Sequence, residues 1–201
     1  MKIIDLSQPL SNNMTVFPND PAFYQEEIMN HETDDFSLSL IKTGLHAGTH
    51  IDAPYHFHRD GKKVDEIALK ELIGPSQIVD INEQEINMEQ LSAIKSFGVV
   101  LLRTGWDKKW GFPEYFQNNP YLTHEASEFL VEKKIKGLGI DGPSVDMMGK
   151  TLVHKKLLSN NIWIVENLAN LGKINTTPFE INFIPLSIKA EASPIRAFAR
   201  L

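Results

Sequence analysis

The stretch HAGTHIDAPYHF, which starts at His46, concentrates side chains that can bind a metal ion or move a proton. His46, His50, Asp52 and His56 all occupy positions of the same parity. On an extended strand, where side chains alternate between two faces, all four would point the same way. A helix would also bring His46 near His50, but the glycine, the β-branched residues and Pro54 of this stretch oppose a helix. We therefore predict a strand that ends at Pro54 and presents one polar face.

This polar face has the composition of a metal site. Histidines at i and i+4 with an aspartate at i+6 supply three ligands of the kind that suits zinc, manganese or iron. Gly48 would leave room for the ion, because glycine has no side chain. The alternative is a polar face turned to water, but solvation does not require three histidines at one parity. Since the chain contains no cysteine, any metal must be held by nitrogen and oxygen.

Two further candidate ligands lie late in the chain. Glu166 ends the apolar run IWIV and shares the parity of Ile162 and Ile164, so its carboxylate is carried toward buried surface and needs a partner. A metal ion, an arginine or a helix end could each serve as that partner. His154 lies in a short helical pattern beside two lysines, and on local grounds alone a surface histidine is the better interpretation.

The segment GLGIDG, from Gly137 to Gly142, matches the glycine pattern of dinucleotide-binding turns. However, the residues before it read as the end of a helix rather than as a strand, and Pro143 falls where the following helix should already have begun. We therefore interpret Gly137 as a helix stop and Gly139 as a residue inside the next strand.

Composition limits the class of protein. The 201 residues suffice for one domain, 1–201, with a sizeable core, and 42% hydrophobic residues are typical of a globular chain. A net charge of −6 without any basic stripe argues against a nucleic-acid partner and favours a small molecule. No apolar run approaches the length of a membrane span or of a signal sequence, so we expect no membrane partner and a cytoplasmic location.

The pattern along the chain changes near Pro75. The first part is rich in strands, and the remainder alternates strands with helices, which together predict a mixed α/β domain. Asn87 and Gln90 form a plausible capping box at the start of the first helix. The predicted strands are 2–6, 24–29, 36–44, 76–81, 98–105, 137–141 and 162–168, and the predicted helices are 87–97, 123–136 and 151–160.

The histidine-rich stretch resembles the signature H-x-G-T-H-x-D-x-P-x-H of the metal-dependent cyclase superfamily, which includes bacterial kynurenine formamidases (arylformamidases) and isatin hydrolases. The resemblance extends through most of the chain. The segment DLSQPLSNNMTVFPND is similar to the opening of the family, LLRTGW and GIDGPSVD to its central strands, and ASPIRA to its carboxyl end.

The resemblance implies roles for individual residues. In the formamidases the first two histidines and the aspartate of the signature bind metal, and the last histidine is the acid/base, which here is His56. A later histidine and glutamate twelve residues apart complete the site, and His154 and Glu166 have that separation. The implied ligands are His46, His50, Asp52, His154 and Glu166, with Asp52 and Glu166 as bridges if two ions bind.

The resemblance also implies an architecture and a reaction. The fold of the family is a swivelling β/β/α domain, usually in homodimers or larger homo-oligomers. One or two divalent ions per chain, zinc before manganese, would convert a bound water to hydroxide and polarise the carbonyl of a small amide. His56 would carry the proton from that water to the leaving nitrogen.

The sequence departs from the family in one segment near the substrate. Formamidases tend to carry the segment WPGD, whereas here it reads FPND, with Phe17 in place of the tryptophan and Asn19 in place of the glycine. Phe17 keeps an aromatic face that can bind a ring. We expect an aryl formamide such as N-formylkynurenine as substrate, with an isatin-like cyclic amide as the alternative. A metal-binding module without catalysis and a nucleotide-dependent oxidoreductase are the hypotheses outside this class.

Overall fold

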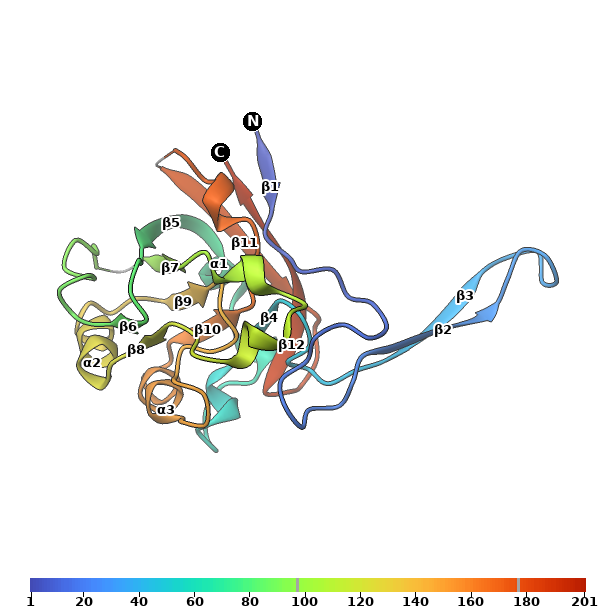
Figure 1. Cartoon of the computed structure of the whole chain (residues 1–201), viewed down its shortest axis with the longest axis horizontal. Helices are drawn as coiled ribbons and strands as arrows, with labels where there is room; N and C mark the ends of the chain where they lie inside the picture. The colour runs from blue at the N-terminus through green and yellow to red at the C-terminus, as the bar shows by residue number, and fades with distance from the viewer. Residues whose placement is uncertain (97, 177) are drawn as a thin grey trace.

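The computed structural model describes residues 1–96, 98–176 and 178–201 (Figure 1). Within the described residues, strands outnumber α-helices, and three short α-helices lie between them. The strands are β1 (Ile3–Asp5), β2 (Tyr24–Met29), β3 (Leu38–Lys42), β4 (His50–Asp52), β5 (Ile73–Asp80), β6 (Glu85–Ile86), β7 (Val99–Arg103), β8 (Tyr121–Leu122), β9 (Gly137–Ile140), β10 (Trp163–Glu166), β11 (Phe179–Pro185) and β12 (Ala192–Arg200). The helices are α1 (Leu69–Leu72), α2 (His124–Glu132) and α3 (Leu152–Ser159).

The main sheet closes on itself. Eight strands follow the order β1-β12-β11-β5-β7-β9-β10-β4, and β4 pairs again with β12, so seven of the strands form a barrel-like ring. Strands β5, β7, β9 and β10 run parallel to one another. The other pairings of the ring, β10–β4, β4–β12, β12–β11 and β11–β5, are antiparallel. Because β1 pairs with β12, the two ends of the chain lie together (Figure 1).

The central strands β7, β9 and β10 are buried along nearly their whole length, and alternate residues of β7 and β10 enter two different cores. In β7, Val99 and Leu101 belong to the core inside the ring. Val100 and Leu102 belong to a second core, which is shared with residues of α2 and α3 on the outside. The mixed α/β fold with a strand-rich beginning is therefore confirmed.

Two glycines of GLGIDG, Gly137 and Gly139, lie in strand β9 of the sheet. Gly137 does not stop a helix: α2 has already ended at Glu132, and Gly137 is the first residue of β9. A Cβ at Gly137 would lie 2.3 Å from the indole ring of Trp163, which is buried in the neighbouring strand. Gly139 lies inside β9 as predicted, and α3 does not begin until Leu152. The segment therefore lacks the strand-to-helix turn that cradles a dinucleotide.

The predicted helices are only partly right. Segments 123–136 and 151–160 contain α2 and α3, but the segment 87–96 forms successive turns with bonds such as Leu91 N to Met88 O rather than an α-helix. Residue 97, the end of that predicted helix, lies outside the described residues. The capping box is present, since Asn87 N donates to Gln90 Oε1 at 2.8 Å. In the described residues, no helix has the length and apolar character needed to cross a membrane.

Candidate metal centre

Two neighbouring strands carry the centre of the polar cluster. In the antiparallel pairing of β10 with β4, Glu166 lies opposite His50 and Ile164 lies opposite Asp52. Opposite residues of an antiparallel pair share a face, so His50, Asp52 and Glu166 point to the same side of the sheet. This is also the side of Ile164, as the parity of Glu166 predicts. All three polar side chains are buried.

The histidine-rich stretch is not one continuous strand, contrary to the prediction. Only His50–Asp52 is extended, and His56 ends a 3-10 turn formed by Pro54–His56. Gly48 interrupts the strand because it has a left-handed backbone with φ of 62°. A Cβ at Gly48 would lie 2.5 Å from Leu10 Cδ2, so this glycine makes room for Leu10 rather than for an ion.

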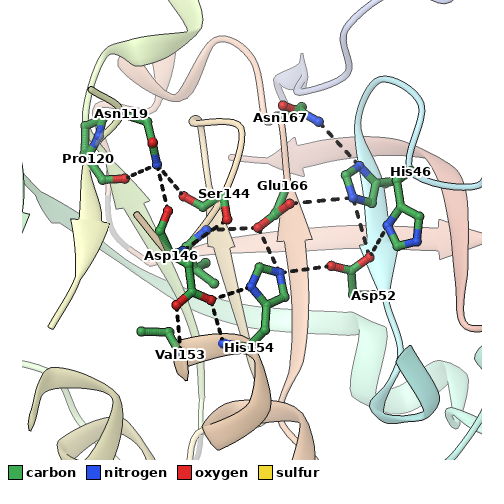
Figure 2. A network of polar contacts seen from close by, with 12 residues as sticks. His46, Asp52, Asn119, Pro120, Ser144, Asp146, Val153, His154, Glu166 and Asn167 are labelled. Carbon is green, nitrogen blue, oxygen red and sulfur yellow. Dashed lines mark hydrogen bonds and ion pairs between the residues drawn. The ribbon is translucent and has the colours of Figure 1, made fainter. Parts of the chain in front are cut away.

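The turns nevertheless bring the predicted residues together around Asp52 (Figure 2). Asp52 Oδ1 lies 2.9 Å from His46 Nδ1 and 3.5 Å from His50 Nε2, and its Oδ2 lies 3.4 Å from His154 Nε2. The ring of His56 has its centroid 4.5 Å from that of His46. All six residues predicted as ligands or acid/base therefore border one site, although their roles stay predictions.

His154 reaches this site from α3 on the outside of the ring. Its Nε2 lies 3.2 Å from Glu166 Oε1, while its Nδ1 contacts Asp146 Oδ2 at 2.7 Å (Figure 2). Asp146 also accepts the backbone N–H groups of Val153 and His154, each at 2.9 Å. The Asp146 carboxylate thereby fixes both the first turn of α3 and the orientation of the imidazole. Local sequence could not reveal this role, because the contact depends on the fold around residue 146.

Asn119 holds the loop that carries Asp146. The buried Asn119 Nδ2 lies within 3.2 Å of three carbonyl oxygens, those of Pro120, Ser144 and Asp146. In the same loop, Val145 N donates to Glu166 Oε1 at 2.9 Å. One short loop therefore orients Glu166 and, through Asp146, His154.

Asn167 is a further residue that the sequence analysis missed. Its Nδ2 donates to Gly48 O at 2.8 Å, and the same carbonyl lies 2.9 Å from His50 Nδ1. When Nδ1 of His50 carries the proton, it donates to this carbonyl. The other ring nitrogen, Nε2, then has a free lone pair and faces Asp52 and Glu166. The side chain of Asn167 is itself held by the buried Tyr115, whose hydroxyl donates to Asn167 Oδ1 at 2.8 Å.

The electrostatics of the cluster favour a cation. Burial would raise the pKa of Asp52, but the nearby His46 and His50 hold it well below its usual range. Burial alone would lower the pKa of His46, yet the Asp52 carboxylate raises it to about 9. The carboxylates likewise outweigh burial at His154 and raise its pKa well above the usual range. The site therefore holds positive charge strongly, either as protons or as metal.

His56 behaves differently from the other histidines. Burial lowers its pKa below the ordinary value, and the neighbouring imidazoles oppose the raising effect of Asp52. The side chain is therefore neutral at neutral pH and can accept a proton.

The buried polar atoms of the cluster fit a metal ion. Among the described residues, His50 Nε2 is buried and makes no hydrogen bond. Asp52 Oδ1 is also buried, and it lies 2.9 Å from His46 Nδ1 and 3.5 Å from His50 Nε2. An unpaired polar atom at such depth is costly, and imidazole and carboxylate are both groups that bind metals. Two overlapping triads have ligand atoms within 4.8 Å of one another: His46, Asp52 and His56, and His50, Asp52 and Glu166. Asp52 belongs to both triads, which suits a residue that bridges two ions.

An aromatic pocket of about 220 Å³ opens onto the cluster. Phe17 lies in its wall as predicted, packed edge-to-face on Phe116 with the ring centroids 5.7 Å apart. Phe57 and Trp110 complete the aromatic wall. Trp110 was not foreseen, because no local pattern shows that the loop after β7 reaches residues near the amino terminus.

Comparison with known proteins agrees with this geometry. The Cyclase family model matches residues 4–147. A kynurenine formamidase of Bacillus cereus is 36% identical over 205 residues, which cover 98% of this chain and 96% of that protein. Isatin hydrolase A from Labrenzia aggregata, solved with bound benzyl benzoate, superposes with a TM-score of 0.90 at 27% identity, covering 98% of this chain and 93% of the other.

A second solved structure with a similar fold is described as a metal-dependent enzyme. A potential metal-dependent hydrolase with cyclase activity has a TM-score of 0.83 and 26% identity over 98% of this chain and 96% of the other. The match of the family model and the full-length similarity to the formamidase both confirm the resemblance seen in the histidine-rich signature. The chain therefore belongs to the Cyclase family.

Proposed function

We propose that this protein is a metal-dependent hydrolase that cleaves the amide C–N bond of an aryl formamide, with N-formylkynurenine as the first candidate substrate. The observation that carries the proposal is the convergence of three imidazoles and two buried carboxylates, with His50 Nε2 making no hydrogen bond, at the base of an aromatic pocket. The similarity to kynurenine formamidase along nearly the whole chain supports the substrate class.

The proposed ligands are His46, His50, Asp52, His154 and Glu166. Imidazole nitrogen with carboxylate oxygen suits zinc first and manganese second, and Asp52 has the position of a bridge if two ions bind. When bound, a divalent ion polarises the substrate carbonyl and lowers the pKa of water.

The protein side chains supply orientation and proton transfer. The contact of His154 Nδ1 with Asp146 and that of His50 Nδ1 with Gly48 O hold the two Nε2 atoms toward the centre. His56, which is neutral at neutral pH, would accept a proton from the attacking water and deliver it to the leaving nitrogen. The substrate ring would lie against Phe17 and the neighbouring aromatic side chains.

The role of His56 separates this proposal from a site that only binds metal. General acid/base catalysis contributes roughly 10²- to 10⁴-fold, so His56→Ala should lose activity on that scale and keep its metal. Elemental analysis of the variant provides the second measurement. If His56→Ala loses metal, His56 belongs among the ligands, as the triad with His46 and Asp52 allows. Full activity of His56→Ala would contradict the proposed mechanism.

A substrate panel tests the choice of an aryl formamide. Aryl formamides, isatin and non-aromatic amides would be compared with zinc and with manganese, for the wild type and for Phe17→Ala. Isatin is the second candidate, because the isatin hydrolase of Labrenzia aggregata shares this fold over nearly the whole length of both chains. A clear preference for non-aromatic amides, or an unaltered KM for the best aryl substrate in Phe17→Ala, would refute the proposed recognition of a ring.

We propose in addition that the enzyme is a homo-oligomer, with the homodimer as the smallest unit.

A further inference from the structure

The aromatic pocket is lined by two charged side chains that take no part in the metal cluster, Asp20 and Lys150. Among the described residues, neither forms an ion pair within 4.0 Å or a side-chain hydrogen bond. The charged members of the cluster, in contrast, contact one another or the backbone. One unpaired carboxylate and one unpaired ammonium group therefore border the pocket together with its aromatic wall.

Asp20 ends a β-turn that begins at Phe17. The backbone N–H of Asp20 donates to Phe17 O at 3.0 Å. Pro18 occupies the second position of the turn, and Asn19 in the third has a left-handed backbone with φ of 76°. This is the pattern of a type II turn, whose end residues have Cα atoms within about 7 Å of each other. The turn therefore places an anionic residue and an aromatic residue side by side in the pocket wall.

Lys150 reaches the pocket from the loop that precedes α3. Its backbone N–H donates to Met147 O at 2.9 Å, and Gly149 between them has a left-handed backbone with φ of 79°. This turn lies between Asp146, which orients His154, and the first residue of α3. Lys150 is exposed, so its ammonium group is accessible to a ligand that enters the pocket.

Asp20 also lies close to the part of the chain that enters the metal centre. The next residue, Pro21, packs on Gly44, since a Cβ at Gly44 would lie 3.4 Å from Pro21 Cδ. His46 follows Gly44 by two residues. Asp20 therefore borders the pocket beside the segment that carries His46, whereas Lys150 borders it beside the helix that carries another proposed ligand.

An aromatic wall with one anion and one cation beside it matches the chemistry of an aromatic α-amino acid. Such a molecule carries a carboxylate and an ammonium group on a single carbon atom. Each of these groups loses water when it enters a pocket, and each is then stabilised by a partner of opposite charge. N-formylkynurenine has both groups at the end of a short chain on its ring, and isatin has neither. The two unpaired charges therefore favour the former.

We propose that Lys150 binds the carboxylate, and Asp20 the ammonium group, of an aryl formamide that is also an α-amino acid. This inference rests on the proposed function. It adds to that function two specificity-determining residues that lie outside the metal cluster.

Four formamides separate the two contacts. N-formylkynurenine carries both charges, its deaminated analogue carries only the carboxylate, its decarboxylated analogue carries only the ammonium group, and ortho-formamidoacetophenone carries neither. Lys150→Met should lower kcat/KM about 10-fold more for the two carboxylates than for the other two compounds, mainly through KM. Asp20→Asn should discriminate in the same way against the two compounds that carry an ammonium group.

Lys155→Met is the matched control for the loss of a positive charge. Lys155 is exposed on α3 and does not line the pocket, although its Nζ lies only 6.0 Å from the ring centroid of Phe57 in the pocket wall. This variant should not discriminate among the four formamides. Equal losses of Lys150→Met on all four, or the same discrimination in Lys155→Met, would overturn the proposal. A wild type that hydrolyses N-formylkynurenine no better than ortho-formamidoacetophenone would overturn it and leave the hydrolase activity in place.

A binding measurement does not depend on turnover, so it separates failure of this inference from failure of the proposed function. Calorimetry on the zinc-loaded protein compares kynurenine, which keeps the amino acid but has no formyl group, with ortho-aminoacetophenone, which has neither. Kynurenine should bind about 10-fold more tightly or better, and Lys150→Met should remove most of this difference.

Two results of the binding measurement would refute the assignment. The first is equal dissociation constants of the two compounds in the wild type. The second is a preference for kynurenine that persists in both Lys150→Met and Asp20→Asn, because the amino acid would then be bound by other groups, such as the metal. A preference that depends on Lys150, in a protein that hydrolyses no formamide, would support this inference and contradict the proposed function.

Discussion

Asp146 is predicted to set the metal affinity of a centre that it does not itself enter. Its carboxylate accepts three hydrogen bonds at 2.7–2.9 Å, from Val153 N, His154 N and His154 Nδ1. In Asp146→Asn one oxygen remains, and the amide nitrogen must face at least one of these donors. If it faces Nδ1, the histidine changes tautomer and its Nε2 carries a proton toward the site.

The magnitude follows from the usual effect of such supporting contacts. Loss of a carboxylate that orients a histidine ligand lowers metal affinity by roughly 10- to 100-fold, or about 1.4 to 2.7 kcal/mol. Competition with a chromogenic chelator measures the zinc dissociation constant of Asp146→Asn. Glu128→Gln is the matched control, because Glu128 pairs with Lys156 on the same helix α3 but outside the centre. An unaltered dissociation constant in Asp146→Asn, or equal losses in both variants, would refute the reasoning.

Three further changes test other parts of the structure. Asp52→Ala should abolish activity and most metal binding, because water cannot replace an anionic oxygen shared by both triads, and full metal occupancy would contradict the assignment. Gly137→Ala should lower the free energy of unfolding, measured with urea, by about 1 to 3 kcal/mol, because the added Cβ would clash with the buried Trp163 ring. The control Gly172→Ala should leave this free energy unchanged, because no atom lies within 4 Å of the added Cβ. Burial raises the pKa of Asp141 to about 6, so the folded state binds the extra proton and stability should fall by roughly 3 kcal/mol as pH rises from about 4 to above 6. The difference in unfolding free energy between the metal-free wild type and metal-free Asp141→Asn should therefore vary with pH, and a constant difference would contradict this.

The sequence predicted the composition of the site better than its geometry. His46, His50, Asp52 and His56 do meet, but the single strand expected for them breaks at Gly48. Parity cannot detect such a break, because glycine is compatible with both an extended and a left-handed backbone. His154 and Glu166 were weak ligand candidates from local pattern alone, and the resemblance to a family strengthened both.

The supporting residues were beyond sequence reasoning for a different reason. Asp146, Asn119 and Asn167 act through contacts whose geometry only the folded loops define. The predicted helix at 87–97 illustrates a second limit, since its apolar spacing is satisfied by consecutive turns that bury Leu91 and Ile94. The spacing of these apolar residues is typical of a helix, but consecutive turns can bury the same residues.

The closure of the ring by β4 has a consequence for folding. This strand has only three residues, yet it pairs with both β10 and β12, and it places His50 opposite Glu166, a residue 116 positions later in the chain. Contacts of such sequence separation form late and slowly, because most of the chain must be ordered before they add stability. The proposed ligands would therefore assemble only when the ring closes, and a partly folded chain would offer no complete centre for an ion. Metal binding would then depend on completed folding, and a bound ion would oppose separation of β4 from its neighbours.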